Sequence, residues 1–143
     1  LVHGRLPRAQ DRIRLRVARD RWRRTRMTTR SALRGREAIT DYRVLRELGN
    51  FTLVEAVLHT GRTHQFRVHF SALGHPVVGD TLYGAPRILP LGAKSAPTLN
   101  RNFLHAQQVC LNHPRTGDRL EISAPLPPEL EAFLRQLEDL TRP

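Results

Sequence analysis

Two runs of alternating side chains in the middle of the chain predict an antiparallel hairpin. Residues Thr40–Leu48 and Phe51–Leu58 each place apolar side chains at every second position, which is the period of a β-strand. Gly49 and Asn50 stand between the two runs, and this pair is typical of a tight turn. We therefore expect a hairpin at the centre of the fold.

Two helices are predicted from apolar residues spaced three and four positions apart. The first runs from Thr63, a suitable N-cap, to about Leu73, and the second opens at Pro127 and Pro128, where proline costs little. Their expected buried stripes are Phe66, Phe70 and Leu73 in the first helix, and Leu130, Phe133, Leu134, Leu137 and Leu140 in the second.

The rest of the chain predicts shorter elements. Strands are expected over Arg12–Val17, Phe103–Leu111 and Arg119–Ser123, with irregular structure over His75–Gly84 and a surface loop over residues 85–102. Hairpins dominate and no alternation of strand, helix and strand appears. We therefore expect one α+β domain over residues 1–143, with a mainly antiparallel sheet and a few helices.

The charge changes this picture of an ordinary small domain. Lys and Arg total 24 against 13 Asp and Glu, a net charge of +11, and nearly all of the cations are arginine. Such an excess favours a nucleic-acid partner, although a genome rich in G and C is the alternative. Residues 1–36 form a basic, loop-rich arm. Its run of arginines around Trp22 is either a solvated surface or a segment that follows phosphates. We expect Trp22 to anchor this segment by packing, and the alternative is a platform on which a base stacks.

Several classes of protein are excluded. The single cysteine, Cys110, allows no disulfide and no cysteine-based zinc site within the chain, and we expect it in the core. No apolar run approaches the roughly 18 residues of a membrane span. We expect His69, His75 and His105 to be buried hydrogen-bonding residues, so no metal site is predicted.

One stretch carries specific chemistry. Residues 60–70 read Thr-Gly-Arg-Thr-His-Gln-Phe-Arg-Val-His-Phe, and residues 74–84 read Gly-His-Pro-Val-Val-Gly-Asp-Thr-Leu-Tyr-Gly. Together they closely resemble the RluA family of pseudouridine synthases. Further similarity is carried by Leu104-His105-Ala106, by His113-Pro114 with Thr116-Gly117, by Ala124-Pro125-Leu126-Pro127, by residues 38–45 and by residues 1–4.

The resemblance implies the isomerisation of uridine to pseudouridine in RNA, without a cofactor or a metal. It implies a flipped-out nucleotide in a cleft, an aspartate as the catalytic group and a basic residue paired with it. Ribosomal RNA of the large subunit is the favoured substrate, and a cytoplasmic monomer is expected. The fold implied is one part of the catalytic domain of that family.

Site residues follow by matching positions. Arg67 matches the basic partner of the aspartate, and the alternative is a structural pair with Glu55 or Asp80. In this chain we expect Arg67 to have no buried carboxylate of its own. Asp80 belongs to a structural turn, and Tyr83 is interpreted as a packing residue. The expected RNA-binding residues are Arg62, His64, Arg23, Arg24 and Arg26, and the expected apolar wall against the base is Val77 or Val78.

The chain departs from the family in two respects, because the family tyrosine, which would lie just before Leu1, is missing as well as the catalytic aspartate. The family aspartate lies in a His-Arg-Leu-Asp tetrad, which does not occur in these 143 residues. We interpret the chain as the C-terminal part of a catalytic domain and expect it to be inactive alone. Two alternatives remain: a non-catalytic RNA-binding module, and a plain basic domain that needs a partner to fold. An upstream tetrad in the reading frame would favour the enzyme.

Overall fold

The computed structural model describes residues 1–23, 25–30, 35–87, 89 and 97–141. Arg24 lies outside the described residues. The predicted loop over residues 85–102 and the predicted arm over residues 1–36 lie partly outside them.

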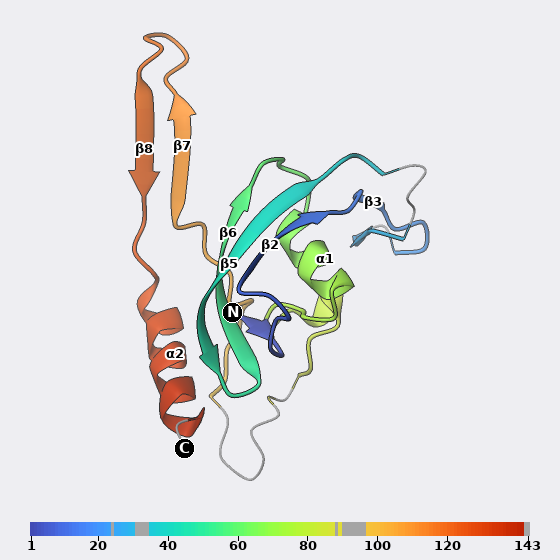
Figure 1. The fold of residues 1–143 in the computed structure, drawn as a ribbon, viewed down its shortest axis with the longest axis vertical. Coiled ribbons are helices and arrows are strands. Elements are labelled where there is room, and N and C mark those ends of the chain that lie inside the picture. The colour runs from blue at the N-terminus through green and yellow to red at the C-terminus, as the bar shows by residue number, and fades with distance from the viewer. Residues whose placement is uncertain (24, 31–34, 88, 90–96, 142–143) are drawn as a thin grey trace.

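A four-stranded antiparallel sheet forms the centre of the molecule, in the order β1-β6-β5-β2 (Figure 1). β5 (Ile39–Leu48) and β6 (Phe51–Leu58) form the predicted hairpin, and Gly49 adopts the left-handed φ of 58° that its turn requires. β1 (Val2–His3) pairs with β6, and β2 (Gln10–Arg14) pairs with β5.

Two details of the sheet differ from the prediction. The strand expected over Arg12–Val17 ends at Arg14, and Val17 instead forms a single bridge with Arg36. A β-bulge between Val44 and Arg46 interrupts the alternation of β5. An extra residue in one strand bends it and changes which side chains face the core.

Two helices are the longest in the described part of the chain, as predicted: α1 (Gln65–Ala72) and α2 (Pro128–Thr141). The N-cap of α1 is His64 and not Thr63, and Leu73, expected in the buried stripe, is 41% exposed. A single 3-10 turn, η1 (Thr81–Tyr83), follows the irregular segment after α1.

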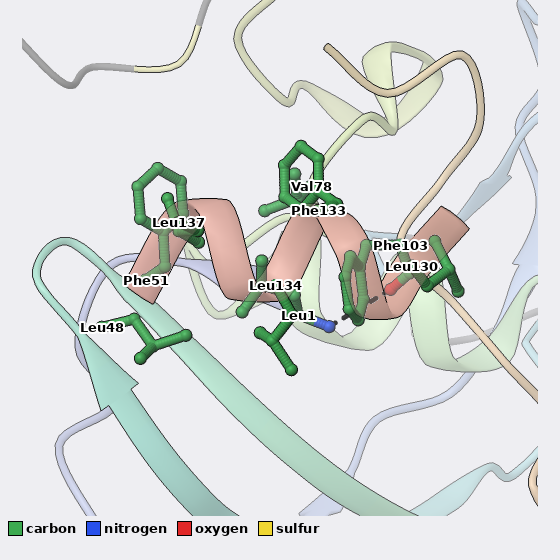
Figure 2. Close-up of a cluster of buried hydrophobic side chains, with 9 residues drawn as sticks. All are labelled: Leu1, Leu48, Phe51, Val78, Phe103, Leu130, Phe133, Leu134 and Leu137. Carbon is green, nitrogen blue, oxygen red and sulfur yellow. Dashed lines mark hydrogen bonds between the residues drawn. The ribbon is translucent and has the colours of Figure 1, made fainter. Parts of the chain in front are cut away.

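The two larger hydrophobic clusters of the described residues hold these elements together. Figure 2 shows α2 packed against the closed end of the central hairpin, where Leu137 lies near Leu48 and Phe51, while Leu130 lies beside Phe103 at the other end of the helix. The second cluster lies between the sheet and α1 and includes Tyr42 and Phe70, whose rings are 5.5 Å apart. Both clusters are assembled from segments distant in sequence. Replacing one large buried side chain of either cluster with alanine would lower the free energy of unfolding by about 2–5 kcal/mol.

Two small hairpins extend from this body. β3 (Ala18–Arg19) pairs with β4 (Met27–Thr28), and β7 (Gln108–Asn112) pairs with β8 (Arg119–Ser123). Figure 1 shows β7 and β8 projecting away from the sheet above α2. Cys110 on β7 is therefore exposed, and its expected place in the core is wrong. The predicted strand began at Phe103, which is buried although it precedes the strand.

The observed fold confirms an α+β class with antiparallel sheets throughout the described residues. None of the described helices has the length and apolar character needed to cross a membrane.

Candidate functional site

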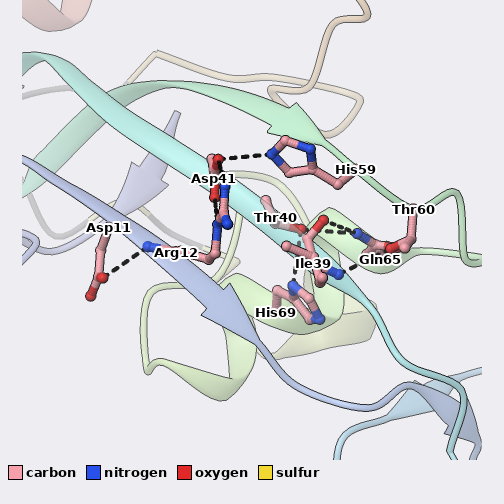
Figure 3. Close-up of polar contacts among 9 residues, drawn as sticks. All are labelled: Asp11, Arg12, Ile39, Thr40, Asp41, His59, Thr60, Gln65 and His69. Carbon is pink, nitrogen blue, oxygen red and sulfur yellow. Dashed lines mark hydrogen bonds and ion pairs between the residues drawn. The ribbon is translucent and has the colours of Figure 1, made fainter.

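A glutamine fixes the loop that leads into α1. The Gln65 side chain accepts hydrogen bonds from the Thr60 hydroxyl (2.7 Å) and the Arg62 backbone N–H (3.0 Å). Its amide nitrogen donates to the Ile39 carbonyl and to Thr40 Oγ1, both at 3.0 Å (Figure 3). Gln65 is buried, and all four bonds end within the fold. The motif therefore needs glutamine here to tie its loop to β5, a role that the sequence did not reveal.

Arg67 forms a two-bond pair with Asp80. Its Nε donates to Oδ2 at 2.7 Å and its Nη2 donates to Oδ1 at 2.8 Å. The Asp80 side chain is 1% exposed and that of Arg67 is 16% exposed. The expectation that Arg67 has no buried carboxylate is therefore wrong, because a carboxylate buried this deeply must be paired. The hydrogen bond with Asp80 raises the pKa of Arg67.

Tyr83 lies at the centre of this site. The guanidinium carbons of Arg67 and Arg26 lie 4.8 Å and 5.2 Å from the centroid of its ring, both within cation–π range. Its hydroxyl accepts a hydrogen bond from the Met27 backbone N–H at 2.9 Å. Tyr83 is buried, which agrees with a packing role, and it also joins the basic arm to α1.

His64 has a backbone conformation that residues other than glycine rarely adopt. Its φ is 56°, the left-handed region, and among the described residues it is the only non-glycine there. Its Nδ1 lies 2.9 Å from the Tyr83 hydroxyl, which already accepts from Met27 and so has its proton available for His64. Burial, and the Arg67 charge nearby, lower the pKa of His64. A neutral His64 then carries its proton on Nε2.

Three other predicted site residues make different contacts. Arg62 Nε donates to the Glu37 carbonyl at 3.1 Å. Val77 and Val78 are buried in two different hydrophobic clusters and expose no surface to a base. The structure gives both valines a packing role in place of the expected wall, because the turn before Gly79 carries them under the sheet and α2.

The arginines divide into two groups by their partners. Among the described residues, eight arginines form ion pairs with carboxylates, and the pairs include Arg12–Asp41, Arg43–Glu55 and Arg67–Asp80. Within residues 14–36, by contrast, none of the described arginines lies within ion-pair distance of a carboxylate. Residues 14–36 contain ten Arg and one Asp, a charge of +9, which leaves +2 for the remainder of the chain. Arg23 is exposed on this segment, and Arg26 is half-buried against Tyr83.

A separate ion cluster lies on the outer face of the sheet. Asp41 accepts two bonds from Arg12 (2.6 and 2.7 Å), and His59 Nε2 lies 2.8 Å from Asp41 Oδ2, one of the two oxygens that Arg12 binds (Figure 3). These bonds hold the pKa of Asp41 well below its usual range. All three side chains are partly in water, so the cluster is worth little to stability.

The described residues contain no group of three His, Cys, Asp or Glu side chains that could hold a metal ion. His69, expected to be a buried hydrogen-bonding residue, is buried and lies 3.0 Å from both Thr40 Oγ1 and the Leu15 carbonyl. His75 and His105 are half-buried, and each bonds a backbone carbonyl.

Comparisons with known proteins place these residues in a family. A profile of the RNA pseudouridylate synthases matches residues 2–72, which include the Arg67 motif. An "uncharacterized RNA pseudouridine synthase" of Chlorobaculum parvum is 46% identical over 112 residues, which are 72% of this chain and 34% of that protein. "Ribosomal large subunit pseudouridine synthase D" of Nitrosomonas europaea is 42% identical over 106 residues, 74% of this chain and 31% of that protein. The chain thus spans about a third of the length of these curated relatives.

The fold gives the same result. The solved structure of human RNA pseudouridylate synthase domain containing 1 superposes with a TM-score of 0.64 at 26% identity, covering 99% of this chain and 64% of that one. Motif, profile, relatives and fold agree, and the chain belongs to the RluA family of RNA pseudouridine synthases.

Proposed function

We propose that this chain supplies the RNA-binding arm and the catalytic arginine of an enzyme that isomerises uridine to pseudouridine in RNA. Large-subunit ribosomal RNA is the favoured substrate, because relatives from Nitrosomonas europaea and Vibrio parahaemolyticus carry that name. A ribosomal substrate in turn favours action in the cytoplasm, and we propose that the protein works there as a monomer.

The geometry of Arg67 is the observation that carries this proposal. Asp80 occupies Nε and Nη2, and among the described residues Nη1 has no hydrogen-bond partner. A guanidinium has donors on a second edge, so it can pair with two carboxylates at once. We propose that Nη1 faces the catalytic aspartate of the family tetrad. A guanidinium within about 4–6 Å would lower the pKa of that aspartate by roughly 1–3 units and keep it ionised beside the base.

RNA contact is proposed for the basic arm and the residues next to Tyr83. Arg23, Arg24 and Arg26 belong to the segment that holds +9 of the +11 net charge. Arg62 and His64 stand at the start of α1, and His64 offers an Nε2–H donor to a phosphate or a uracil carbonyl. Ionised donors without a carboxylate partner are the groups that displace counterions from RNA.

The test is release of tritium from RNA labelled at carbon 5 of uridine, since that hydrogen leaves when the base is rejoined through carbon 5. The polypeptide of 143 residues should release none, because it has no His-Arg-Leu-Asp tetrad. The protein expressed from its complete reading frame should release tritium if the tetrad is encoded upstream. Turnover by the 143 residues alone would contradict the proposed division of the site.

A matched pair of variants tests Arg67 in the complete protein. Arg67→Lys keeps a charge for Asp80 but has no second edge for another carboxylate, so turnover should fall by about 10²-fold. Arg43→Lys, at an exposed pair with Glu55, is the control and should leave turnover unchanged. If neither the 143-residue polypeptide nor the complete protein releases tritium while both still bind RNA, the alternative of a non-catalytic RNA-binding module is supported.

A further inference from the structure

Trp22 is the one aromatic side chain that the fold leaves in water. It is the single tryptophan of the chain and is 88% exposed, so its expected role as a packing anchor is wrong. Every Phe and Tyr ring, in contrast, is buried or half-buried. A tryptophan buries about 150–250 Å² when it packs, and leaving that area in water forgoes a large stabilisation. Its exposure therefore calls for a function.

The turn that presents Trp22 is built by hydrogen bonds. Asp20 Oδ1 accepts from the backbone N–H groups of Trp22 (2.9 Å) and Arg23 (3.1 Å). Asp20 N–H donates to the Arg26 carbonyl (2.9 Å), and Arg26 N–H donates to the Arg23 carbonyl (2.8 Å). A side chain that bonds the backbone two and three residues ahead fixes the turn. Trp22 is thus held at the end of the β3–β4 hairpin.

The base of this hairpin is fixed beside the Arg67–Asp80 pair. Met27 donates its N–H to the Tyr83 hydroxyl, and Arg26 lies over the Tyr83 ring. Arg67 lies over the same ring at 4.8 Å. Because one buried tyrosine contacts both the hairpin and the proposed catalytic arginine, Trp22 has a defined position relative to the site.

The chemistry around Trp22 selects its ligand. The Arg21 guanidinium lies 5.8 Å from the centroid of the Trp22 ring, and residues 19–26 contain five arginines against one aspartate. An exposed ring beside arginines that, where the structure describes them, have no carboxylate partner matches a single-stranded nucleic acid, whose bases stack on aromatic side chains and whose phosphates pair with arginine. Duplex bases are already stacked and offer no free face.

We propose that Trp22 is a stacking platform for an unpaired nucleotide of the RNA, held beside the site by the Tyr83 contacts. The inference rests on the proposed RNA function and extends it: the preferred substrate has a single-stranded nucleotide near the target uridine. An anionic membrane surface also attracts tryptophan and arginine, and the experiment separates the two.

Because the chain has one tryptophan, its fluorescence reports on this residue alone. We would titrate the 143-residue protein with a short oligouridylate, an RNA duplex of equal length, heparin, and vesicles of phosphatidylserine with phosphatidylcholine. The oligouridylate should quench the emission in a saturable way, and the other three should change it little. Equal quenching by heparin or the duplex, or a blue shift with vesicles in place of quenching by RNA, would overturn the proposal.

Variants separate stacking from charge. Trp22→Ala should weaken binding of labelled oligouridylate by about tenfold or more, and Trp22→Phe should recover most of the affinity. Neither should change the dependence on salt, because no cation is removed. Ile122→Ala, at another exposed apolar residue on β8, is the control and should bind as the unmodified protein does.

The outcomes also separate this inference from the function on which it rests. RNA binding that depends on salt but is unaffected by Trp22→Ala would overturn the stacking platform and leave the proposed function standing. No binding of any RNA by the unmodified protein would overturn both.

Discussion

At the residue scale, the Arg67–Asp80 pair changes what a substitution of Arg67 means. Asp80 is buried, so removing the arginine leaves an uncompensated charge inside the protein. We expect Arg67→Met to lower the free energy of unfolding by about 3–5 kcal/mol. Adding Asp80→Asn should restore part of this loss, because the buried charge is then absent. Urea denaturation of both single variants and the double variant measures the coupling. If the change in the free energy of unfolding of the double variant equals the sum of the changes in the two single variants, the two residues do not stabilise the fold as a pair.

The sequence predicted the importance of Arg67 but not its partner. Asp80 and Glu55 are the two carboxylates that the sequence offers as structural partners for Arg67. Which of them pairs with Arg67 depends on how the chain returns to α1 after the helix ends. Gly79 makes that return possible: its φ is 83°, and a Cβ there would lie 2.4 Å from the Arg101 carbonyl oxygen. A contact with a backbone 22 positions further along the chain has no local signal in the sequence.

His69 gives stability a dependence on pH. The Leu15 carbonyl can only accept, so His69 Nε2 carries the proton; Thr40 accepts from Gln65 and donates to Nδ1. The folded state therefore needs the neutral ring, and burial lowers the pKa of His69 below 6.5. Between the two pKa values the unfolded chain binds more protons, so this contribution is complete above pH 6.5 and is lost as pH falls through the folded pKa.

We therefore expect His69→Gln, which does not titrate, to be most destabilising relative to the unmodified protein near pH 8. The difference between the free energies of unfolding of the two proteins should become smaller towards about pH 5, as the unmodified protein loses the contribution of His69. Urea denaturation of both proteins across this range measures it. His3 also has a pKa lowered by burial, but it is present in both proteins and cancels in the comparison. A difference that is constant with pH would contradict the assigned protonation state.

At the element scale, periodicity predicted which segments form strands but not what covers them. β8 lies where the pattern placed it, over Arg119–Ser123. Its partner β7 carries Val109 and Leu111, yet both are at least 40% exposed because the hairpin projects from the body with no layer against it. Alternation reports the two faces of a strand, and only tertiary structure decides whether the apolar face is buried. The error at Cys110 has this origin.

The Tyr83 side chain anchors the β3–β4 hairpin to the body of the fold. Tyr83→Phe keeps the ring that Arg26 and Arg67 contact but removes the hydroxyl that accepts from Met27 and bonds His64. We expect faster hydrogen exchange at the Met27 amide and faster tryptic cleavage within the arm, with little change in the core. Tyr42→Phe, at a buried tyrosine that packs on Phe70, is the matched control. Unchanged exchange at Met27 in Tyr83→Phe would show that other contacts hold the hairpin.

At the scale of the whole molecule, the net charge predicted a nucleic-acid partner but not where the charge acts. The excess is concentrated in residues 14–36, and most arginines of the body are neutralised by carboxylates within 4 Å. The amino-acid composition gives only the total net charge. The division appears when the strands bring Arg12 to Asp41 and Arg43 to Glu55, which are pairs set by register. Two variants with the same net charge should therefore bind RNA differently.

The first variant replaces Arg19, Arg23 and Arg30 of the arm with glutamine, and the second replaces Arg43, Arg101 and Arg135 of the body. Each loses three charges, so long-range attraction to RNA falls equally in both. Local phosphate contacts fall only in the first, because the body arginines are paired with Glu55, Glu129 and Glu131. With a slope of about 0.7 per phosphate contact on single strands, the arm variant should lose roughly 2 from the slope of log K against log salt. Fluorescence anisotropy of labelled RNA over a series of salt concentrations measures both slopes. An equal loss in the two variants would mean that RNA responds to the total charge of the protein and that the arm is not its binding surface.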